Sequence, residues 1–414
     1  MSTVSFGKYI DPMHIAVVTN FYPPQTNSAA NQLCDLVTGL IQVGHRVTLF
    51  VATEEDCEKP VSTKGLLTII RIRVCKMARV NYIQRLFAEW TMPLLMKRWL
   101  LRSNLCCNQW DGIIWYSPSI FLGPFIRHIK NKSRCPAYLI LRDIFPQWCL
   151  DLQILKPGWL FNRLNAVAWK QYQLADVIGI QSFGNSVFLQ STLKKNIGQV
   201  EVLHNWLGRP LPKTSSIQIN QTALKGRKIL VYAGNMGVAQ GFDQIIELAS
   251  TLVDRKDIGF LLVGQGKDVN RLRKRIAREK IDNTLIFDAI VPQMLPDLYR
   301  QCAAGLISLD VRHTTHNIPG KFLSYLQAGL PIFALVNPGN DLVHLIKSNQ
   351  VGVACTSDSL NHLIMNLNQL LSRIECEDFS KRCQALYQQQ YTPQRAVKQI
   401  MDVFLKYRDH AHGK

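Results

Sequence analysis

Short apolar runs alternate with amphipathic stretches along most of the chain. The first cycle has an apolar run at 14–20, a stretch with one apolar face at 31–43, and another apolar run at 46–52. Short apolar runs bounded by turn residues predict buried strands, and an apolar face that recurs every three to four positions predicts a helix. A strand–helix–strand opening is typical of a parallel, doubly wound α/β sheet. The other elements expected in this half are strands at 68–74, 112–116, 137–141, 177–181 and 201–203, and a helix at 160–174.

The alternation stops at residues 208–227, GRPLPKTSSIQINQTALKGR, which are polar, contain prolines and show no clear period. That composition predicts a linker. After the linker the pattern returns, with strands at 228–233, 259–263, 284–287, 304–308 and 331–336, and helices at 242–253, 268–279, 294–301 and 320–328.

We therefore expect two Rossmann-like domains, 1–207 and 228–388, that face each other across a cleft. Residues 389–414 are expected to form a C-terminal helix that can pack back on the first domain. Ligands of such folds bind outside the carboxyl ends of the strands.

Glycine turns follow the first two strands of the second domain. Gly234-Asn235-Met236-Gly237 and then Gln240-Gly241 lead into a helix, and Gly264-Gln265-Gly266 follows the next strand. Glycines let a ligand approach the backbone, and the free N–H groups and dipole of a helix N-terminus favour an anion. A plain strand-to-helix connection remains the alternative for the first turn. The second turn lacks the third glycine of a dinucleotide fingerprint.

A third turn lies within THNIPGKFLSYLQAGLPIFALV. Lys321 follows Pro319-Gly320 at the expected start of a helix. An ammonium there and the N–H groups of the turn could converge on one anion. A solvated lysine on a surface helix is the other interpretation. Three such loops at one edge of one domain favour a diphosphate ligand.

The charge balance is strongly basic, with 48 Lys and Arg against 29 Asp and Glu and a net charge of +19. That excess indicates an acidic partner, either nucleic acid or an anionic membrane. The sequence has no zinc-finger spacing and no aromatic single-strand platform, so we expect no nucleic acid. Eleven cysteines without a Cys-x-x-Cys pair, and no signal peptide, favour a cytoplasmic location.

No uncharged apolar run is long enough to cross a membrane. The stretch YIQRLFAEWTMPLLMKRWLL mixes apolar, aromatic and basic residues, which is typical of an interfacial amphipathic segment. We expect residues 82–102 to contact the anionic inner membrane from the cytoplasmic face. A pair of surface helices packed on their own domain is the alternative.

Several stretches resemble the retaining glycosyltransferases of family 4, which have the GT-B fold. They are GNMGVAQGFD, LLVGQG and HNIPGKFLSYLQAGLPIFALVNPGND. YLILRDIFPQW, VLHNW and NFYPPQTNSAANQL are similar to the WbuB-type, L-fucosamine transferase-like branch. The resemblance covers nearly the whole chain. It implies a UDP-sugar donor and a saccharide acceptor on polyprenyl diphosphate, in the synthesis of O-antigen, capsule or exopolysaccharide. The sugar would be an N-acetylated deoxyhexosamine such as L-FucNAc.

The resemblance also implies roles for single residues. The acceptor would bind near Asn27, Ser28 and Asp143, and the catalytic candidates are Arg142, Asp143 and Lys321. The donor-binding candidates are Gly234, Asn235, Gly237, Gln240, Gly264, Gly266, Ala289, Ile290, His316, Pro319, Gly320, Lys321 and Ser324.

The chain departs from the family pattern at several of these positions. His316 and Ser324 stand where many members keep two glutamates, and Gln240 stands in place of the usual lysine. Arg142-Asp143 replaces a His-Asp pair. Without an Asp-x-Asp motif we expect no metal and no other cofactor, so Lys321, backbone N–H groups and a helix dipole would balance the leaving diphosphate.

Retention with no evident nucleophile suits a front-face path, in which the leaving phosphate helps to deprotonate the acceptor. Asp143 could be a base or positioning group, or a helix cap or ion-pair partner of Arg142. Two other functions fit the same architecture. One is a nucleotide-sugar epimerase or hydrolase of the UDP-GlcNAc 2-epimerase type. The other is a non-catalytic nucleotide-sugar-binding protein, which the missing glutamates suggest.

Overall fold

The computed structural model forms two compact units, which are described separately. The first unit holds residues up to Ile180, Leu189–Leu203 and the chain from Ala396 onward, and the second holds Gln181–Phe188 and His204–Arg395. The structure describes residues 11–25, 27–77, 80–117, 119–151, 154–192, 197–209, 211–237, 240–310, 318–357, 359–375 and 378–411.

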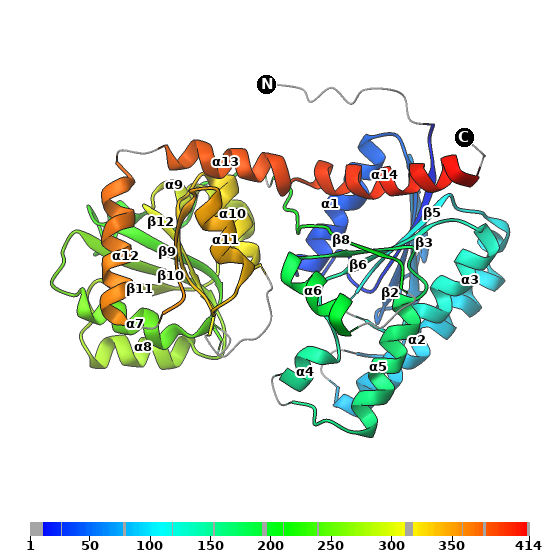
Figure 1. The fold of residues 1–414 in the computed structure, drawn as a ribbon, viewed down its shortest axis with the longest axis horizontal. Helices are drawn as coiled ribbons and strands as arrows, with labels where there is room; N and C mark the ends of the chain where they lie inside the picture. The colour runs from blue at the N-terminus through cyan, green and yellow to red at the C-terminus, as the bar shows by residue number, and fades with distance from the viewer. Residues whose placement is uncertain are drawn as a thin grey trace. The chain divides into compact units, whose positions relative to one another are not determined.

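The first unit is built on an eight-stranded sheet in the order β3-β4-β2-β1-β5-β6-β7-β8 (Figure 1). Neighbouring strands are parallel except β3 and β4, which are antiparallel. The strands are β1 His14–Thr19, β2 Arg46–Thr53, β3 Val61–Lys64, β4 Leu67–Arg73, β5 Gly112–Tyr116, β6 Ala137–Leu141, β7 Val177–Ile180 and β8 Gln199–Val202.

The helices of this half of the chain pack on a core that fills both faces of the sheet. They are α1 Ser28–Gln42, α2 Tyr82–Arg102, α3 Gly123–Ser133, α4 Gln147–Asp151, α5 Trp159–Tyr172 and α6 Phe183–Thr192. A short 3-10 turn, Asn104–Cys107, follows α2.

Helix α2 is one continuous helix, although Pro93 lies within it. The side chain of Asn81 caps its first turn and forms a capping box with Gln84. Its buried side chains, which include Met92 and Met96, pack on the core of the first unit. The alternative prediction of a pair of surface helices in this segment is therefore wrong, because the segment forms one helix. Within the described residues, no helix combines the length and the apolar character needed to cross a membrane.

The last helix, α14 Pro393–Ala411, packs on the sheet of the first unit. Two glycines make room for it: a Cβ on Gly39 would meet Val397, and a Cβ on Gly112 would meet the ring of Phe404. Gln399 also donates to the Val202 carbonyl at 2.9 Å. The C-terminal helix thus completes the first unit after the chain has built the second.

The second unit has a fully parallel six-stranded sheet in the order β11-β10-β9-β12-β13-β14 (Figure 1). This is the doubly wound order, and its direction switches between β9 and β12. The strands are β9 Lys228–Asn235, β10 Ile258–Gln265, β11 Thr284–Phe287, β12 Ala304–Ser308, β13 Ile332–Leu335 and β14 Gly352–Cys355. The prediction of an α/β fold with two parallel sheets is confirmed.

Helices cover both faces of the second sheet (Figure 1). One face packs on α9 Leu295–Arg300, α10 Gly320–Ala328, α11 Asp341–Ser348 and α13 Phe379–Gln390. The other packs on α7 Phe242–Thr251, α8 Val269–Arg278 and α12 Leu360–Arg373.

The stretch expected to be a linker, 208–227, is largely part of the second unit. Ile217, Ile219 and Leu224 are buried in its core, and the Ser215 N–H donates to Asp297 at 2.8 Å. A 3-10 turn, Ile219–Gln221, lies within it. Its apolar residues are spaced irregularly, because they pack as an extended strap rather than as a helix or strand.

We predict that Phe404→Ala selectively destabilises the first unit, by about 3–5 kcal/mol, because it leaves a cavity where the ring packs over Gly112. Hydrogen exchange followed by mass spectrometry should show lost protection in β1 and β5 and unchanged protection in β9 and β12. The matched control is Lys406→Ala on the exposed side of α14. Equal loss in both sheets, or none in either, would contradict the assignment of α14 to the first unit.

Candidate functional site

Helix α10 is fixed above the point where the second sheet changes direction. Its Tyr325 hydroxyl is buried and donates to the carbonyl groups of Val231 on β9 at 3.0 Å and of Leu306 on β12 at 3.1 Å. Lys321 lies four residues earlier, so it shares this face of the helix. The tyrosine therefore directs the lysine toward the carboxyl ends of β9 and β12.

The Lys321 side chain lies across Gly234. A Cβ on Gly234 would be 2.7 Å from the lysine Cε and 3.1 Å from its Nζ, and Gly234 has a φ of +147°. The Nζ atom lies 4.6 Å from the centre of the Tyr232 ring. The φ angle favours glycine at 234, and the missing side chain leaves the space that the lysine occupies.

Burial lowers the pKa of Lys321 to about 8, since desolvation disfavours the charged form. Within the described part of the chain no carboxylate counters this effect or forms an ion pair with the ammonium. A buried cation without a counter-ion is costly in the free protein. The same cation is a ready site for an anion.

The first glycine turn lies next to this lysine and is held by hydrogen bonds to its own residues and to neighbouring strands. The Tyr232 hydroxyl donates to the Asn235 carbonyl at 2.6 Å, and the Gly237 N–H donates to the Gln240 side-chain oxygen at 3.0 Å. Ser308, the last residue of β12, donates to the Gln240 carbonyl at 2.5 Å. These bonds join the turn to both strands, and α7 begins directly after it with no side-chain cap.

The second glycine turn has a packing explanation. A Cβ on Gly264 would collide with the Gly234 carbonyl, and one on Gly266 with the Met236 carbonyl. Both glycines have positive φ angles. They are needed for the close approach of β9 and β10, so their presence does not by itself indicate a ligand contact.

The other donor-binding candidates are less closely gathered. Ser324 donates back to the Gly320 carbonyl within α10 at 3.4 Å, and Pro319 is the residue before that helix. Ile290 packs against the core beyond β11, and Ala289 beside it is exposed. His316 lies outside the described residues. The structure therefore brings together Lys321 with the turn that contains Gly234, Asn235, Gly237 and Gln240.

In the first unit, Arg142 and Asp143 directly follow β6. Arg142 is only 5% exposed, and its Nη1 donates to the Leu203 carbonyl at 2.6 Å. Burial lowers the pKa of its guanidinium, and Tyr116 partly opposes this effect. These contacts tie the end of β6 to the end of β8, so Arg142 has a structural role that the sequence did not reveal.

Burial raises the pKa of Asp143, and the nearby charge of Arg142 only partly offsets the effect. Asp143 also acts electrostatically on Tyr116 and Tyr172, which shows that these hydroxyl groups lie near it. A carboxylate with a raised pKa is suited to act as a general base near neutral pH.

The acceptor candidate Asn27 is used as a helix cap. The Asn27 side chain accepts from the Ala30 N–H at 2.8 Å and so caps α1. Ser28 is the exposed first residue of that helix. Both residues lie beyond the carboxyl end of β1, at the same edge of the sheet as Asp143.

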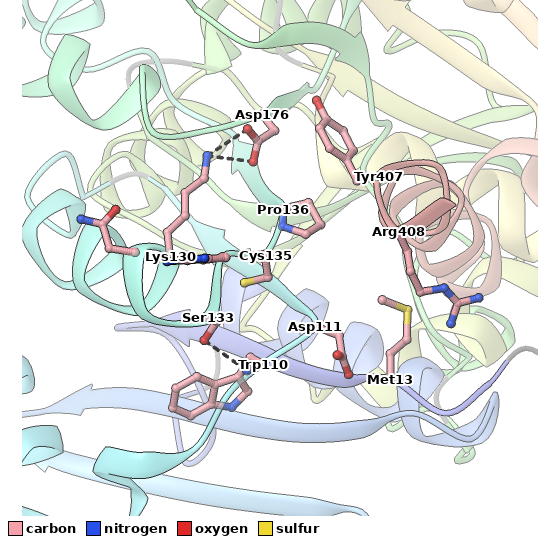
Figure 2. Close-up of a pocket in the computed structure, with 12 residues that line it drawn as sticks. Met13, Trp110, Asp111, Lys130, Ser133, Cys135, Pro136, Asp176, Tyr407 and Arg408 are labelled. Carbon is pink, nitrogen blue, oxygen red and sulfur yellow. Dashed lines mark hydrogen bonds and ion pairs between the residues drawn. The ribbon is translucent and has the colours of Figure 1, made fainter. Parts of the chain in front are cut away.

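A cavity of about 620 Å3 in the first unit lies at the opposite edge of the sheet (Figure 2). Its lining residues precede β1, β5, β6 and β7, and include Trp110 and the ion pair between Lys130 and Asp176 at 2.8 Å. Arg408 of α14 lines it as well. Because the binding residues of doubly wound sheets lie at the carboxyl ends of the strands, this cavity is not the candidate site.

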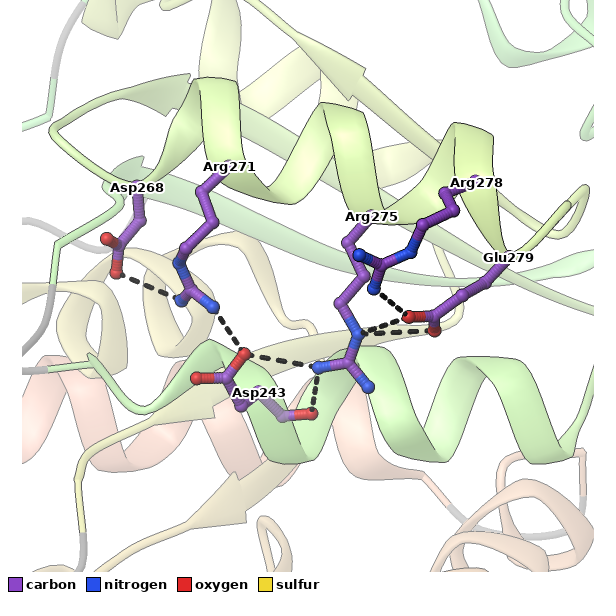
Figure 3. A network of polar contacts seen from close by, with 6 residues as sticks. All are labelled: Asp243, Asp268, Arg271, Arg275, Arg278 and Glu279. Carbon is purple, nitrogen blue, oxygen red and sulfur yellow. Dashed lines mark hydrogen bonds and ion pairs between the residues drawn. The ribbon is translucent and has the colours of Figure 1, made fainter.

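Helix α8 is strongly basic, but acidic residues pair with much of its charge (Figure 3). Asp243 in the first turn of α7 accepts from Arg271 at 2.6 Å and from Arg275 at 3.1 Å. The hydrogen bond from Arg271 is the main reason that the pKa of Asp243 is lowered. Exposed pairs of this kind contribute little to stability, and here they join α7 to α8.

In the described residues no cluster of His, Cys, Asp and Glu could hold a metal ion.

Residues 215–386 match the family model "Glycosyl transferases group 1". The chain is 22% identical over 228 residues to "Probable glycosyltransferase WbjE" of Pseudomonas aeruginosa, covering 52% of this chain and 55% of that protein. It is 24% identical over 272 residues to "Putative colanic acid biosynthesis glycosyl transferase WcaI" of Escherichia coli K12, covering 63% and 66%. These alignments thus span between about half and two thirds of the relatives' lengths.

The fold is similar to that of Anabaena HepE, solved in complex with UDP and glucose. The TM-score is 0.62 at 15% sequence identity, over 95% of this chain and all of that one. The glycine turn and Lys321 lie within the matched residues 215–386. The second unit is therefore similar to a group 1 glycosyl transferase domain, set in a chain with the two-sheet fold of GT-B glycosyltransferases.

Proposed function

We propose that the protein is a retaining, family 4-type glycosyltransferase that transfers a sugar from a UDP-sugar to a lipid-linked saccharide. The observation that carries the proposal is the largely buried ammonium of Lys321, which pairs with no carboxylate among the described residues and lies beside the Gly234–Gly237 turn. A diphosphate is the anion best suited to this place, because the lysine brings a positive charge and the N-terminus of α7, which has no side-chain cap, brings the positive end of the helix dipole. The match to group 1 glycosyl transferases and the UDP held by HepE support this ligand.

The finer assignment follows the sequence. Its resemblance to the WbuB-type branch favours an N-acetylated deoxyhexosamine such as L-FucNAc as the sugar. It also favours a polyprenyl-diphosphate-linked saccharide of O-antigen, capsule or exopolysaccharide as the acceptor. The name of the E. coli relative, which refers to colanic acid biosynthesis, is consistent with such a pathway.

The reaction breaks the bond between the sugar C1 and a phosphate oxygen and forms a C1 bond to the acceptor oxygen on the same face. UDP leaves with the electron pair, and Lys321 balances its charge. The acceptor proton passes to the departing phosphate while Asp143 orients the hydroxyl; in the alternative path Asp143 is the base and takes the proton in place of the phosphate. In this division the first unit binds acceptor near Asn27, Ser28 and Asp143, and the second binds donor. The charge on the diphosphate is balanced by protein groups, so the proposal includes no metal.

Membrane contact is proposed through one surface of the first unit, which we call the α2–α5 surface. It comprises the exposed apolar residues Tyr82, Ile83, Phe87, Trp90 and Leu94 of α2, together with Ile154 and Trp159. The α2 residues lie within the segment 82–102 that was predicted from the sequence, whereas Ile154 and Trp159 lie outside it. The Ile154 N–H donates to the Cys149 carbonyl of α4, and the charge of Arg85 of α2 acts on the Cys149 thiol, so Ile154 lies near α2. Trp159 begins α5 shortly after it in the chain.

The chemistry of this surface fits an anionic bilayer. Ile83 is 81% exposed and Trp159 72% exposed, which is unusual for large apolar side chains. Basic residues accompany them, including Arg85, Lys97 and Arg163. Apolar insertion and attraction to anionic lipid would act together at the cytoplasmic face of the inner membrane. An acceptor anchored in that membrane would then be within reach of the enzyme.

We predict that the purified protein releases UDP from a panel of UDP-sugars only when a lipid-linked saccharide acceptor is present. The product should keep the anomeric configuration of the donor, as judged by NMR. Inversion at C2 without acceptor would instead support the epimerase or hydrolase. Binding of a UDP-sugar without turnover under any condition would support the non-catalytic protein.

We predict that Lys321→Met has opposite effects on ligand binding and on stability. Affinity for UDP at pH 7 should fall by roughly ten- to a hundredfold, because a charged partner of the diphosphate is lost. Stability should rise. The pKa of Lys321 falls from 10.5 in the unfolded chain to about 8 in the folded protein. Below pH 8 the folded protein holds the ammonium in its charged form, which lowers the free energy of unfolding, and methionine removes this effect.

Calorimetric titration with UDP and thermal unfolding at pH 7 measure these two effects. Lys274→Met on the exposed side of α8 is the control, and both its UDP affinity and its stability should be nearly unchanged. A Lys321→Met variant that binds UDP normally, or that unfolds more easily than the natural protein, would contradict the proposed role.

We also predict that the double variant Ile83→Asp, Phe87→Asp loses binding to vesicles containing anionic phosphatidylglycerol. Co-sedimentation should fall at least tenfold, because two inserted apolar side chains become charged. UDP affinity should not change. Leu211→Asp, which alters an exposed residue of the second unit, serves as the control. Retained vesicle binding by the double variant would exclude the α2–α5 surface as the membrane contact.

A further inference from the structure

Tyr232 makes two contacts that both concern the proposed diphosphate site. Its ring lies under the Lys321 ammonium, with Nζ 4.6 Å from the ring centre. Its hydroxyl donates to the Asn235 carbonyl at 2.6 Å, inside the glycine turn. The residue is fully buried, and its ring also meets Phe242, the first residue of α7. One side chain thus touches the cation, the turn and the helix start.

The lysine reaches this ring by crossing the end of β9. Tyr232 belongs to the core on the α7 face of the sheet, whereas α10 packs on the opposite face. Tyr232 and Gly234 are two positions apart on the strand, so they point to the same side. Lys321 passes through the space left by the missing side chain of Gly234 and ends above the tyrosine.

An aromatic ring suits this position better than a carboxylate would. A carboxylate would hold the ammonium but would cancel the charge that a diphosphate needs. The face of a ring attracts a cation and leaves its net charge in place. The turn itself is uncharged at Asn235 and Gln240, so the positive charge comes from α10.

We propose that Tyr232 is a positioning residue for the donor diphosphate, holding the Lys321 ammonium on its ring and the glycine turn through its hydroxyl. This inference rests on the proposed function, because it takes the diphosphate of a UDP-sugar as the ligand. Tyr232 acts through Lys321 and the turn and does not itself take part in the chemistry.

The test is the affinity for UDP measured by calorimetry between pH 7 and pH 10. The natural protein should bind less tightly above about pH 8, as the free lysine loses its proton. Tyr232 faces the Lys321 ammonium, whereas Tyr325 lies one turn further along α10 and packs against Tyr299, and burial raises the pKa of each of these hydroxyls. The charged residue at the neighbouring strand end is Asp310, beside Gly241. The diphosphate of UDP is almost fully ionised over this range, since phosphate titrates near pH 6. The uracil N3–H ionises at the alkaline end of the range, but it is the same for every variant, so the midpoints are compared between variants.

The two contacts of Tyr232 can be removed separately. Tyr232→Phe keeps the ring and should leave the pH midpoint unchanged, while UDP affinity falls by about two- to tenfold through loss of the hydrogen bond to the turn. Tyr232→Leu removes the ring and should also lower the midpoint by roughly half to one pH unit. Phe260→Leu removes a buried ring from the same core without touching Lys321, so it should leave the midpoint in place.

An unchanged midpoint in Tyr232→Leu, with normal binding by the natural protein, would overturn this inference alone. Should Tyr232→Leu fail to fold, Tyr232→Met removes the ring and Tyr232→Phe still tests the hydroxyl. Full UDP affinity in Tyr232→Phe would overturn the role assigned to that hydroxyl. Failure of the natural protein to bind UDP at any pH would instead refute the proposed function, and this inference with it.

Discussion

A lysine ammonium buried beside a glycine turn, with no carboxylate partner among the described residues, is the constraint on which the second unit depends. Lys321 is held there because Tyr325 fixes α10 to two strands and because Gly234 leaves a path for the side chain. Desolvating the charge is unfavourable in the free protein. The arrangement becomes favourable when an anion arrives, which is why we regard it as a binding site rather than a structural contact.

The two units use buried charge in different ways. Arg142 stands where the family resemblance implies the histidine of a His-Asp pair, and its hydrogen bond to the Leu203 carbonyl ties two strand ends together. Asp143 beside it is the carboxylate that we propose for the chemistry, with a pKa raised by burial. In the second unit the turn is uncharged at Gln240, and Lys321 supplies the cation from another helix.

Much of the fold could be predicted from the sequence, because buried parallel strands are apolar runs and their helices have one apolar face. The strand at 284–287 and the helix at 320–328 occur as predicted. The edge strand β3 was missed because its residues, VSTK, are exposed and have no apolar side. In the site, Lys321 could be found from its turn. Tyr232 could not be found in this way, because within the strand KILVYA it has the pattern of an ordinary core residue. Its role becomes visible only when the structure shows Lys321 lying over its ring.

The most direct test of this account counts the protons taken up when UDP binds at pH 8, by calorimetry in two buffers of different ionisation enthalpy. A lysine with a pKa of about 8 is half protonated there, and a bound diphosphate would complete its protonation. We therefore expect an uptake of about half a proton in the natural protein and none in Lys321→Met. Binding without proton uptake in the natural protein would contradict the claim that Lys321 is the cation that receives the diphosphate.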